Sequence, residues 1–247
     1  MRATDSNAVR TYRESSFPEA LTPWREAGFS VVDLELTGLD PSTHEIISFA
    51  AITVVGGRIR LGDAVHRLVR PRRMPDADTM RIHGLREADL AGAPALDEVL
   101  DELLTRLTGR VLVAHVAVVE VAFLRRALET RGLDLRNPVI DTAALAEEVH
   151  RLRQEPALAN EAETGAPTVS SPGLSRVARW LGLPVHRPHH ADGDALTTAQ
   201  VFLALATHLE EFGEVTVGSL ERDSAPREAQ SAPGGAISRL IGKLRRR

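Results

Sequence analysis

The pattern of apolar and polar positions predicts strands in the first half of the chain. Apolar and β-branched residues dominate three successive segments, Phe29–Leu36, Glu45–Val55 and Arg58–Val69, which we expect to be strands. Gly56 and Gly57 separate the second strand from the third, and such a pair is typical of a tight hairpin turn. The three segments therefore predict a β-meander.

Helical spacing follows the meander. Leucine and valine recur at intervals of three and four residues from Leu96 to Leu107, which predicts a helix with one buried face. A meander followed by alternating strands and helices predicts an α/β fold, with a mixed sheet of about five strands flanked by helices. We expect the remaining strands at 110–115 and 139–142, and the remaining helices at 118–130, 143–152, 174–181 and 191–211.

Changes in composition predict the limits of the domain. Residues 1–16 are polar, and we expect them to be loosely ordered. A short helix is expected from Phe17 to Ala27, with Trp24 packed onto the domain. We expect three regions: a partly helical N-terminal leader at 1–26, a main domain at 27–212 with a mobile insertion at about 154–172, and a linker with a basic C-terminal tail at 213–247.

Composition restricts the partners and the compartment. The formal net charge is −4, so nucleic acid would be attracted by local arginine clusters and metal ions and not by the overall charge. Aromatic residues make up 4% of the chain, which argues against a stacking platform for bases. Cysteine is absent, which excludes disulfides and thiolate zinc sites. With no apolar run long enough to span a membrane, we expect a cytoplasmic protein.

Two acids share one face of the first predicted strand. Side chains alternate along a strand, so Asp33 and Glu35 point the same way, about 7 Å apart along the backbone. Two carboxylates on an apolar strand repel each other and are costly to bury unpaired. One or two divalent cations would resolve this conflict. Further along, His189 and Asp194 lie near the start of a predicted helix, and we expect both stretches to contribute to one metal site.

These stretches resemble motifs of a known family. The run Asp33-Leu-Glu-Leu-Thr-Gly38 resembles the first motif of the DnaQ-like 3′–5′ exonucleases with a DEDDh site, the family of the DNA polymerase III epsilon proofreading subunit. His189, followed five residues later by Asp194, resembles the third motif, with the neighbouring His190 as the alternative histidine. The resemblance covers roughly residues 28–210 and implies a ribonuclease-H-like fold.

The middle motif departs from the family pattern. The aligned run is Ala114-His-Val-Ala-Val-Val-Glu-Val-Ala-Phe-Leu124. Val116 stands where the family has Asn, and it cannot replace the hydrogen bonds of that side chain. Glu120 stands where the family has Asp, so the charge is kept but one methylene is added. Because Mg²⁺ is strict about ligand geometry, Mn²⁺ is the alternative ion.

The resemblance implies hydrolysis of phosphodiesters from the 3′ end by a two-metal mechanism. His189 would take the proton from the attacking water. Two divalent cations, Mg²⁺ or Mn²⁺, would be held by four acids: Asp33, Glu35, Glu120 and Asp194. The substrate would be contacted by Leu36, Thr37 and Gly38 of the first motif, by His83 in an Ile-His-Gly segment, and by the basic loop residues Arg70, Arg72 and Arg73.

Alternatives remain for the substrate and the activity. The implied substrate is single-stranded DNA or a DNA 3′ end, and short RNA is the alternative because contacts to a 2′-hydroxyl cannot be read from the chain. Since we see no polymerase domain, proofreading would require a DNA polymerase partner. A different alternative is a catalytically weakened exonuclease-like module that binds nucleic-acid ends or a polymerase. Val116 and Glu120 are the features that favour it.

Overall fold

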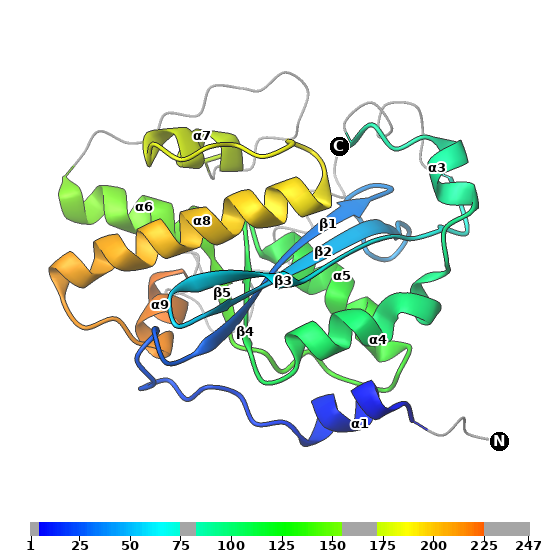
Figure 1. The fold of residues 1–247 in the computed structure, drawn as a ribbon, viewed down its shortest axis with the longest axis horizontal. Coiled ribbons are helices and arrows are strands. Elements are labelled where there is room, and N and C mark those ends of the chain that lie inside the picture. Colours follow the sequence, from blue (N-terminus) through cyan, green and yellow to red (C-terminus); the bar gives the residue numbers. More distant parts are fainter. Residues whose placement is uncertain (1–4, 75–82, 155–171, 225–247) are drawn as a thin grey trace.

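In the computed structural model, a central β-sheet is covered by helices on both faces (Figure 1). The structure describes residues 5–74, 83–154 and 172–224. The sheet has five strands in the order β3-β2-β1-β4-β5. The pairs β1–β2 and β2–β3 are antiparallel, whereas β1–β4 and β4–β5 are parallel, which confirms the predicted mixed sheet. The strands are β1 Gly28–Leu36, β2 Ile46–Val55, β3 Arg58–Leu68, β4 Val111–Ala114 and β5 Val139–Asp141.

The helices form two layers, one on each face of the sheet. One layer contains α8, with α6, α7 and α9 packed beside it, and the other contains α1, α4 and α5 (Figure 1). The predicted strands from β1 onward and the predicted helices from α4 to α8 agree with the observed bounds to within two residues. The helices are α1 Asn7–Glu14, α3 Glu87–Ala91, α4 Leu96–Leu107, α5 Val118–Glu129, α6 Thr142–Arg153, α7 Leu174–Trp180, α8 Ala191–Leu209 and α9 Val217–Asp223, with a 3₁₀ turn at Glu210–Phe212.

Alternation along β1 decides which residues face each helical layer. Phe29 and Val31 are buried on the α8 side, where the ring of Phe29 lies 4.7 Å from that of Phe202 between centroids. Val32 and Leu34 are buried on the α4 and α5 side. Because side chains alternate, the residues at 33 and 35 belong to the α8 side. The apolar pattern of the strand therefore directs both acids toward the start of α8.

The β2–β3 hairpin has the predicted tight turn. Gly56 and Gly57 have φ values of 60° and 68°, and a two-residue turn of this kind requires positive φ at both positions. β2 is buried over almost its whole length because strands flank both of its edges and α8 and α4 cover its two faces. β3 is the edge strand, and most of its residues are exposed.

The structure corrects two predictions for the N-terminal region. Residues Phe17–Ala27 form turns and not the expected short helix. The helix lies earlier, at Asn7–Glu14, in a stretch expected to be loosely ordered. Ser6 begins this helix by accepting a hydrogen bond from a backbone amide, and Tyr12 is buried where its hydroxyl donates to Asn137 Oδ1 at 2.7 Å. A cap and a long-range contact therefore stabilise α1.

The backbone around Trp24 bonds to a distant part of the chain. Its amide donates to the carbonyl of Val215 at 3.1 Å, and Pro23 forms a bridge with Thr216. These bonds replace the local ones that a helix would need, which explains the turns at Phe17–Ala27. Trp24 itself is 2% exposed, so its predicted packing onto the domain is confirmed.

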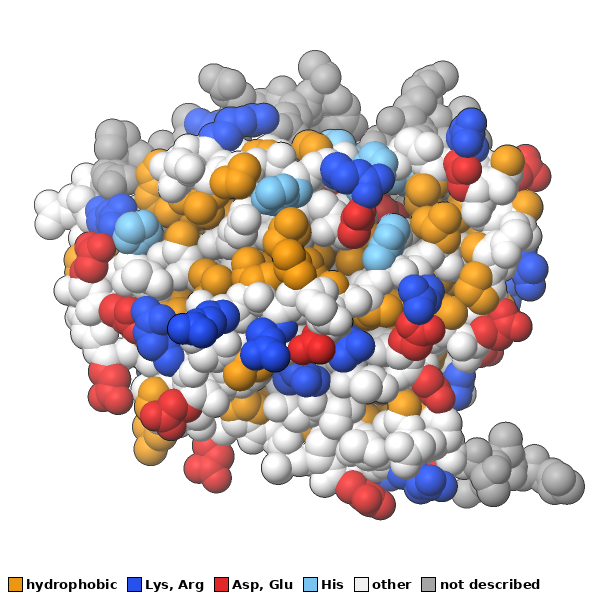
Figure 2. Space-filling model, in the orientation of Figure 1, with side chains coloured by type: hydrophobic (Ala, Val, Ile, Leu, Met, Phe, Trp, Pro, Cys, Tyr) orange, Lys and Arg blue, Asp and Glu red, His pale blue; other side chains and the backbone are white. Residues whose placement is uncertain are grey.

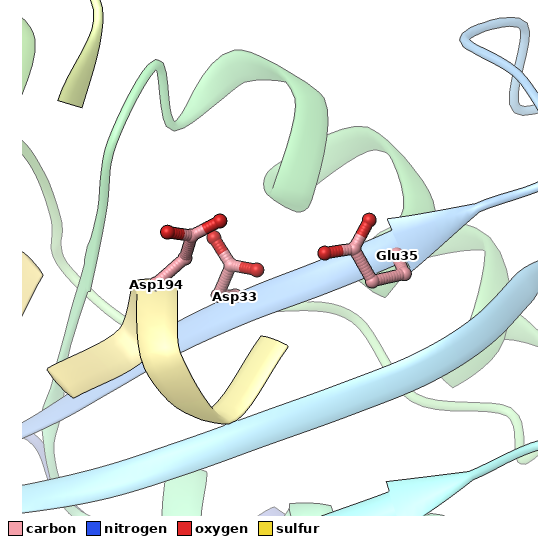
Figure 3. A group of neighbouring side chains, drawn as sticks. All are labelled: Asp33, Glu35 and Asp194. Atoms are coloured by element: carbon pink, nitrogen blue, oxygen red, sulfur yellow. The ribbon is translucent and has the colours of Figure 1, made fainter. Parts of the chain in front are cut away.

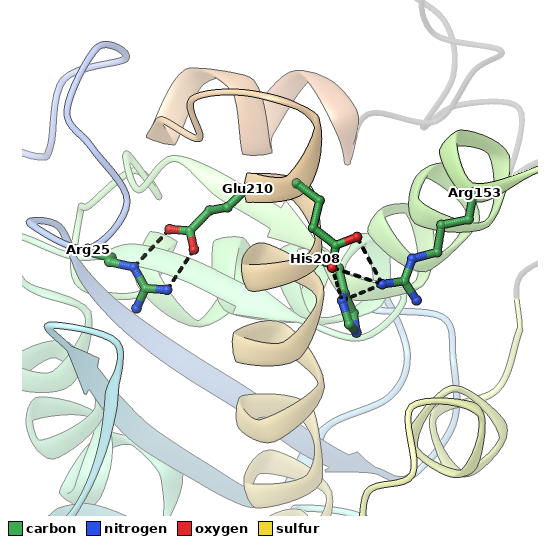
Figure 4. Close-up of polar contacts among 5 residues, drawn as sticks. Arg25, Arg153, His208 and Glu210 are labelled. Carbon is green, nitrogen blue, oxygen red and sulfur yellow. Dashed lines mark hydrogen bonds and ion pairs between the residues drawn. The ribbon is translucent and has the colours of Figure 1, made fainter.

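The C-terminal end of α8 is tied to two other parts of the domain (Figure 4). Arg25 forms two hydrogen bonds of 2.8 Å with the carboxylate of Glu210. On the other side, Arg153 at the end of α6 contacts Glu211 at 3.3 Å. These contacts fix α8 between the N-terminal segment and α6.

Part of the predicted linker is helical. Thr216 caps α9, and Val217 and Leu220 of this helix are fully buried in the core on the α8 side. The predicted insertion, apart from its two ends, and the predicted basic tail from residue 225 lie outside the described residues. Within the described ranges, none of the helices has the length and hydropathy needed to cross a membrane.

Candidate active site

Three carboxylates meet where β1 passes the first turn of α8 (Figure 3). Asp33 and Glu35 project from β1, and Asp194 projects toward Asp33 from the start of the helix. One oxygen atom from each residue can be chosen so that all three lie within 4.8 Å of one another. Carboxylate oxygens are the ligands that Mg²⁺ and Mn²⁺ prefer. The structure therefore brings together three of the four acids expected to bind metal.

Burial makes these carboxylates difficult to ionise. Burial raises the pKa of Asp33 well above its ordinary value, and the charges of Glu120, Asp194 and Glu35 raise it further. Burial and the charge of Asp194 raise the pKa of Glu35 to about 7. The pKa of Asp194 is also raised by burial, against a hydrogen bond from His189. Bound cations would offset this repulsion, so the residues fit the divalent metals that the resemblance implies.

Glu120 approaches the same acids from the first turn of α5. It lies outside the group of three whose oxygens are within 4.8 Å, but its charge is the strongest of those that raise the pKa of Asp33. The side chain is 7% exposed, and Oε2 has no hydrogen-bond partner among the described residues. Burial raises the pKa of Glu120 to about 8. A buried carboxylate oxygen without a partner is costly, which is consistent with a ligand bound beside it.

Asp141 positions the helix that carries Glu120. Its Oδ1 accepts from the amide of Val116 at 2.9 Å, and its Oδ2 accepts from the amide of Ala117 at 3.0 Å. Oδ1 also accepts from the amide of Ala143 at 2.9 Å, which caps α6. One carboxylate thus joins the starts of α5 and α6. This role of Asp141 was not predicted from the sequence, although an Asp between a strand and a helix is a typical N-cap signal.

Val116 has a strained backbone. Its φ is 61°, in the left-handed region that β-branched residues rarely adopt. Asn, the residue expected here from the family pattern, adopts this region more readily. Replacement of Asn by Val therefore costs backbone strain as well as side-chain hydrogen bonds.

Two of three clustered histidines adjoin the acids. The backbone amide of His189 donates to Asp194 Oδ2 at 2.8 Å, and His190 is the residue before the first turn of α8. Both histidines act on Asp194 by lowering its pKa. His186 instead contacts the side chain of Gln200 on α8, with 3.2 Å between Nε2 and Oε1. His189 and Arg187 have φ values of 60° and 34°, so the strained backbone in this loop lies next to the candidate site.

Two other histidines have structural contacts. His115 is held between Thr142 Oγ1 and the carbonyl of Pro172, each at 2.9 Å. Since a carbonyl can only accept, Nε2 of His115 donates to Pro172, and burial lowers the pKa of His115 to about 4. His83 is 2% exposed and accepts from a backbone amide in its own loop, and burial lowers its pKa.

The end of the first motif shapes the loop after β1. Leu36 and Thr37 are buried, and Thr37 Oγ1 accepts from the amide of Glu45 at 2.9 Å. Gly38 lies against the imidazole of His44. These contacts join the end of β1 to the start of β2, and they place the loop beside Glu35.

The expected basic loop is fixed through its backbone. Glu45 Oε2 accepts from the amides of Arg72 at 2.8 Å and Arg73 at 3.2 Å. The side chains of Arg70, Arg72 and Arg73 are exposed. Glu45 therefore fixes the backbone of this loop, and the three guanidinium groups are exposed to solvent.

Comparison of sequences identifies relatives with names from DNA replication. Residues 30–202 match the model of the RNase_T family, which is described as "Exonuclease". A "DNA polymerase III subunit epsilon-like protein" of Rhodobacter capsulatus is 36% identical over 210 residues, which cover 84% of this chain and 27% of that protein. A "DNA polymerase III PolC-type" of Thermotoga maritima is 35% identical over 198 residues, 80% of this chain and 13% of that protein. A "DNA polymerase III subunit epsilon" of Aquifex aeolicus is 29% identical and spans 73% of this chain and 81% of its own.

Solved structures share the fold. E. coli exonuclease I in complex with a dT13 oligonucleotide has a TM-score of 0.64 at 16% identity, over 75% of this chain and 42% of that chain. Exonuclease X in complex with 5′ overhanging duplex DNA has a TM-score of 0.57 at 22% identity, over 80% of this chain and 99% of that chain. At these identities the likeness shows the fold alone, and it agrees with the expected ribonuclease-H-like class. Because the family match runs through most of the chain and includes the three clustered acids, this protein belongs to the exonuclease family.

Proposed function

We propose that this protein is a metal-dependent exonuclease that removes nucleotides from the 3′ end of DNA. The observation that carries the proposal is the half-buried group formed by Asp33, Glu35 and Asp194 within an exonuclease domain. Relatives named as DNA polymerase III proteins, and structures of the same fold in complex with DNA, support DNA as the substrate. Mg²⁺ and Mn²⁺ are the proposed ions.

The four acids would hold these ions. Asp33, Glu35 and Asp194 would bind them directly, and Glu120 would complete the set from α5. When bound, divalent ions stabilise the charge on the attacking and leaving oxygens of a phosphodiester. The chain itself contributes fixed carboxylate positions and a site of low solvent access, where electrostatic interactions are stronger than in water.

His189 would accept the proton of the attacking water. An imidazole exchanges protons near neutral pH, which suits a general base. The backbone of His189 is held by Asp194, while its side chain is exposed and forms no hydrogen bond with the described residues. The backbone of His189 is therefore fixed beside the acids, and its imidazole is free to turn toward a water molecule.

The substrate would enter between the loop after β1 and the start of α8. Leu36, Thr37 and Gly38 would line one side of the entry, and His83 would support the facing loop. The exposed side chains of Arg70, Arg72 and Arg73 would contact phosphates, because an arginine fork matches the geometry of phosphate oxygens.

A second candidate is a weakened exonuclease-like module that binds DNA ends or a DNA polymerase. The observations that favour it are the position of Glu120 outside the group of three acids and the strain at Val116. In that case the four acids would bind metal and a 3′ end with little hydrolysis.

One experiment separates these candidates. Purified protein is incubated with 3′-labelled or 5′-labelled single-stranded DNA in Mg²⁺, Mn²⁺ or EDTA, with an RNA strand run in parallel and Asp33→Asn as the control. The proposal expects a metal-dependent ladder that shortens from the 3′ end of DNA and is lost in the variant. Binding of DNA ends without degradation would select the weakened module, and degradation of RNA alone would change the substrate.

A further inference from the structure

The open edge of the sheet carries a local excess of positive charge. β3 is the edge strand, and from Arg58 to Arg73 the chain contains six arginines and one acid, Asp63. The whole chain, in contrast, has a net charge of −4. Figure 2 shows Lys and Arg side chains in a row across the face over which β3 runs in Figure 1. Overall charge therefore hides a basic surface.

The arginines of β3 share one side of the strand. Arg58 pairs with Val55 and Arg60 with Thr53, on the side of the sheet that α4 covers, and Arg67 on the same side contacts Glu102 of α4 at 2.8 Å. Arg58 and Arg60 are exposed, and neither forms an ion pair with a described residue. Two guanidinium groups are therefore left for a partner.

The opposite side of β3 borders the acids. His66 pairs with Ala50, which pairs with Asp33, so these three residues form a line across three strands on the α8 side. His66 Nε2 lies 3.0 Å from the hydroxyl of Ser48, and Ser48 pairs with Glu35. A nucleic-acid strand that leaves the acids across this edge would therefore pass from His66 to the arginines of β3.

We propose that β3 and the loop after it form a track for the phosphate backbone of DNA outside the active site. The track comprises Arg58, Arg60 and Arg67 of β3 with Arg70, Arg72 and Arg73 of the loop, and it holds the 5′ part of the substrate strand while the 3′ end lies at the acids. This inference rests on the proposed function. Arginine binds phosphate through paired hydrogen bonds, and such contacts add affinity without selecting a sequence.

A competing explanation concerns the edge itself. Charged side chains on an edge strand prevent the pairing of sheets from two molecules. If this is the role of Arg58 and Arg60, their removal should produce self-association and leave the affinity for DNA unchanged. The two explanations therefore predict different results for the same variant.

The test measures DNA binding in EDTA, where no hydrolysis interferes. Fluorescence anisotropy gives the Kd for a short oligonucleotide of about 4 nucleotides, which fills the acid site, and for a long one of about 20 nucleotides, which reaches the track. For the variant R58Q/R60Q, we expect the Kd of the long strand to rise about 10-fold at low salt, because two phosphate contacts are lost. The slope of log K against log salt should become shallower by about 1.4. The Kd of the short strand should not change.

Controls separate the track from other effects. The variant R125Q/R126Q removes two exposed arginines of α5 and should change neither Kd nor the salt slope. Equal weakening for both strand lengths, unchanged binding of the long strand, or self-association of R58Q/R60Q without loss of affinity would overturn the proposal. If Gln is too mild, R58E/R60E tests the same contact by repulsion. Hydrolysis of the short strand is assayed separately with Mg²⁺, so its absence would count against the proposed function and leave the track standing.

Discussion

The backbone amide of His189 donates a hydrogen bond of 2.8 Å to Oδ2 of Asp194. The imidazole takes no part in this contact, so a substitution of His189 can remove the proposed proton acceptor without releasing Asp194. The φ of His189 is 60°, a value that Asn also tolerates. Position 189 therefore allows chemistry and positioning to be tested separately.

His189→Asn should lower kcat about 10²-fold to 10⁴-fold, the usual contribution of a general base. The thermal unfolding temperature should be unchanged, because the backbone hydrogen bond and the left-handed conformation are both kept. His190→Asn is the matched comparison and should leave most of the activity. A larger loss in His190→Asn than in His189→Asn would transfer the role of general base to His190.

Asp33→Asn should abolish hydrolysis and stabilise the metal-free protein. Removal of this charge relieves its repulsion with Glu120, Asp194 and Glu35, which raise its pKa. The increase in unfolding temperature on addition of Mg²⁺ should become smaller. Differential scanning calorimetry with and without Mg²⁺ measures both effects. Glu14→Gln, on the exposed side of α1, is the control for loss of a charge, and full activity in Asp33→Asn would refute the site.

The metal-free protein should lose stability as the pH rises from about 6.5 to about 8.5. The pKa values of Glu35 and Glu120 are raised to about 7 and about 8, so the folded state binds these protons more tightly than the unfolded state. Their contribution is fully present below the ordinary carboxyl pKa and is lost as the pH rises through these values. His115, whose pKa is lowered from 6.5 to about 4, acts in the opposite sense but only below about 6.5.

Thermal unfolding in EDTA across this pH range tests the expectation. Mg²⁺ should restore the lost stability, because the ion compensates the ionised carboxylates. Glu120→Gln should flatten the dependence on pH. A metal-free protein whose unfolding temperature is constant from about pH 6.5 to about 8.5 would contradict the buried state of these acids.

Val116→Asn should raise the free energy of unfolding by about 1 kcal/mol, since Asn tolerates the left-handed backbone that strains Val. Val116→Ala should give a smaller gain, because it removes the branching and keeps Cβ. Val55→Asn, at an exposed position at the end of β2, should give no gain in stability. Urea unfolding measures the three variants. A loss of stability in Val116→Asn would show that contacts of the Val side chain outweigh the strain.

Glu120→Gln should reduce activity strongly while the fold is kept. The variant preserves the shape of a side chain whose charge acts on Asp33, so the loss reports on that charge. Glu120→Asp retains the charge but moves the carboxylate closer to the backbone of α5. The start of this helix is fixed by Asp141. We expect intermediate activity in both Mg²⁺ and Mn²⁺. Higher activity of Glu120→Asp in Mg²⁺ would show that the longer side chain is a handicap.

Local signals in the sequence were sufficient for most of the fold. Alternation in β1, the Gly56–Gly57 turn and the leucine spacing of α4 each depend on residues close in the chain. The helix α1 was missed because Tyr12 is stabilised by Asn137, a partner 125 positions away. The helix expected at Phe17–Ala27 was wrong for a similar reason, since distant backbone groups bond there.

The site was partly accessible from the sequence. Strand alternation placed Asp33 and Glu35 together, and the motif spacing added Asp194, which the structure brings to the same point. The part played by Asp141 required the tertiary structure, because its carboxylate connects amides from two helices. The strain at Val116 likewise depends on a backbone angle that cannot be read from the sequence. The catalytic roles of Glu120 and His189 stay predictions.

The contact between His115 and the carbonyl of Pro172 suggests a place to join this domain to another. Helix α6 ends at Arg153, and the amide of the following residue, Gln154, bonds to the last turn of that helix. The described chain resumes at Pro172, whose carbonyl accepts from His115. Both ends are fixed by contacts within the described part of the chain. A fluorescent or affinity module grafted between positions 155 and 171 should therefore leave the spacing of α6 and α7 intact, and it would give an internal fusion that frees both termini.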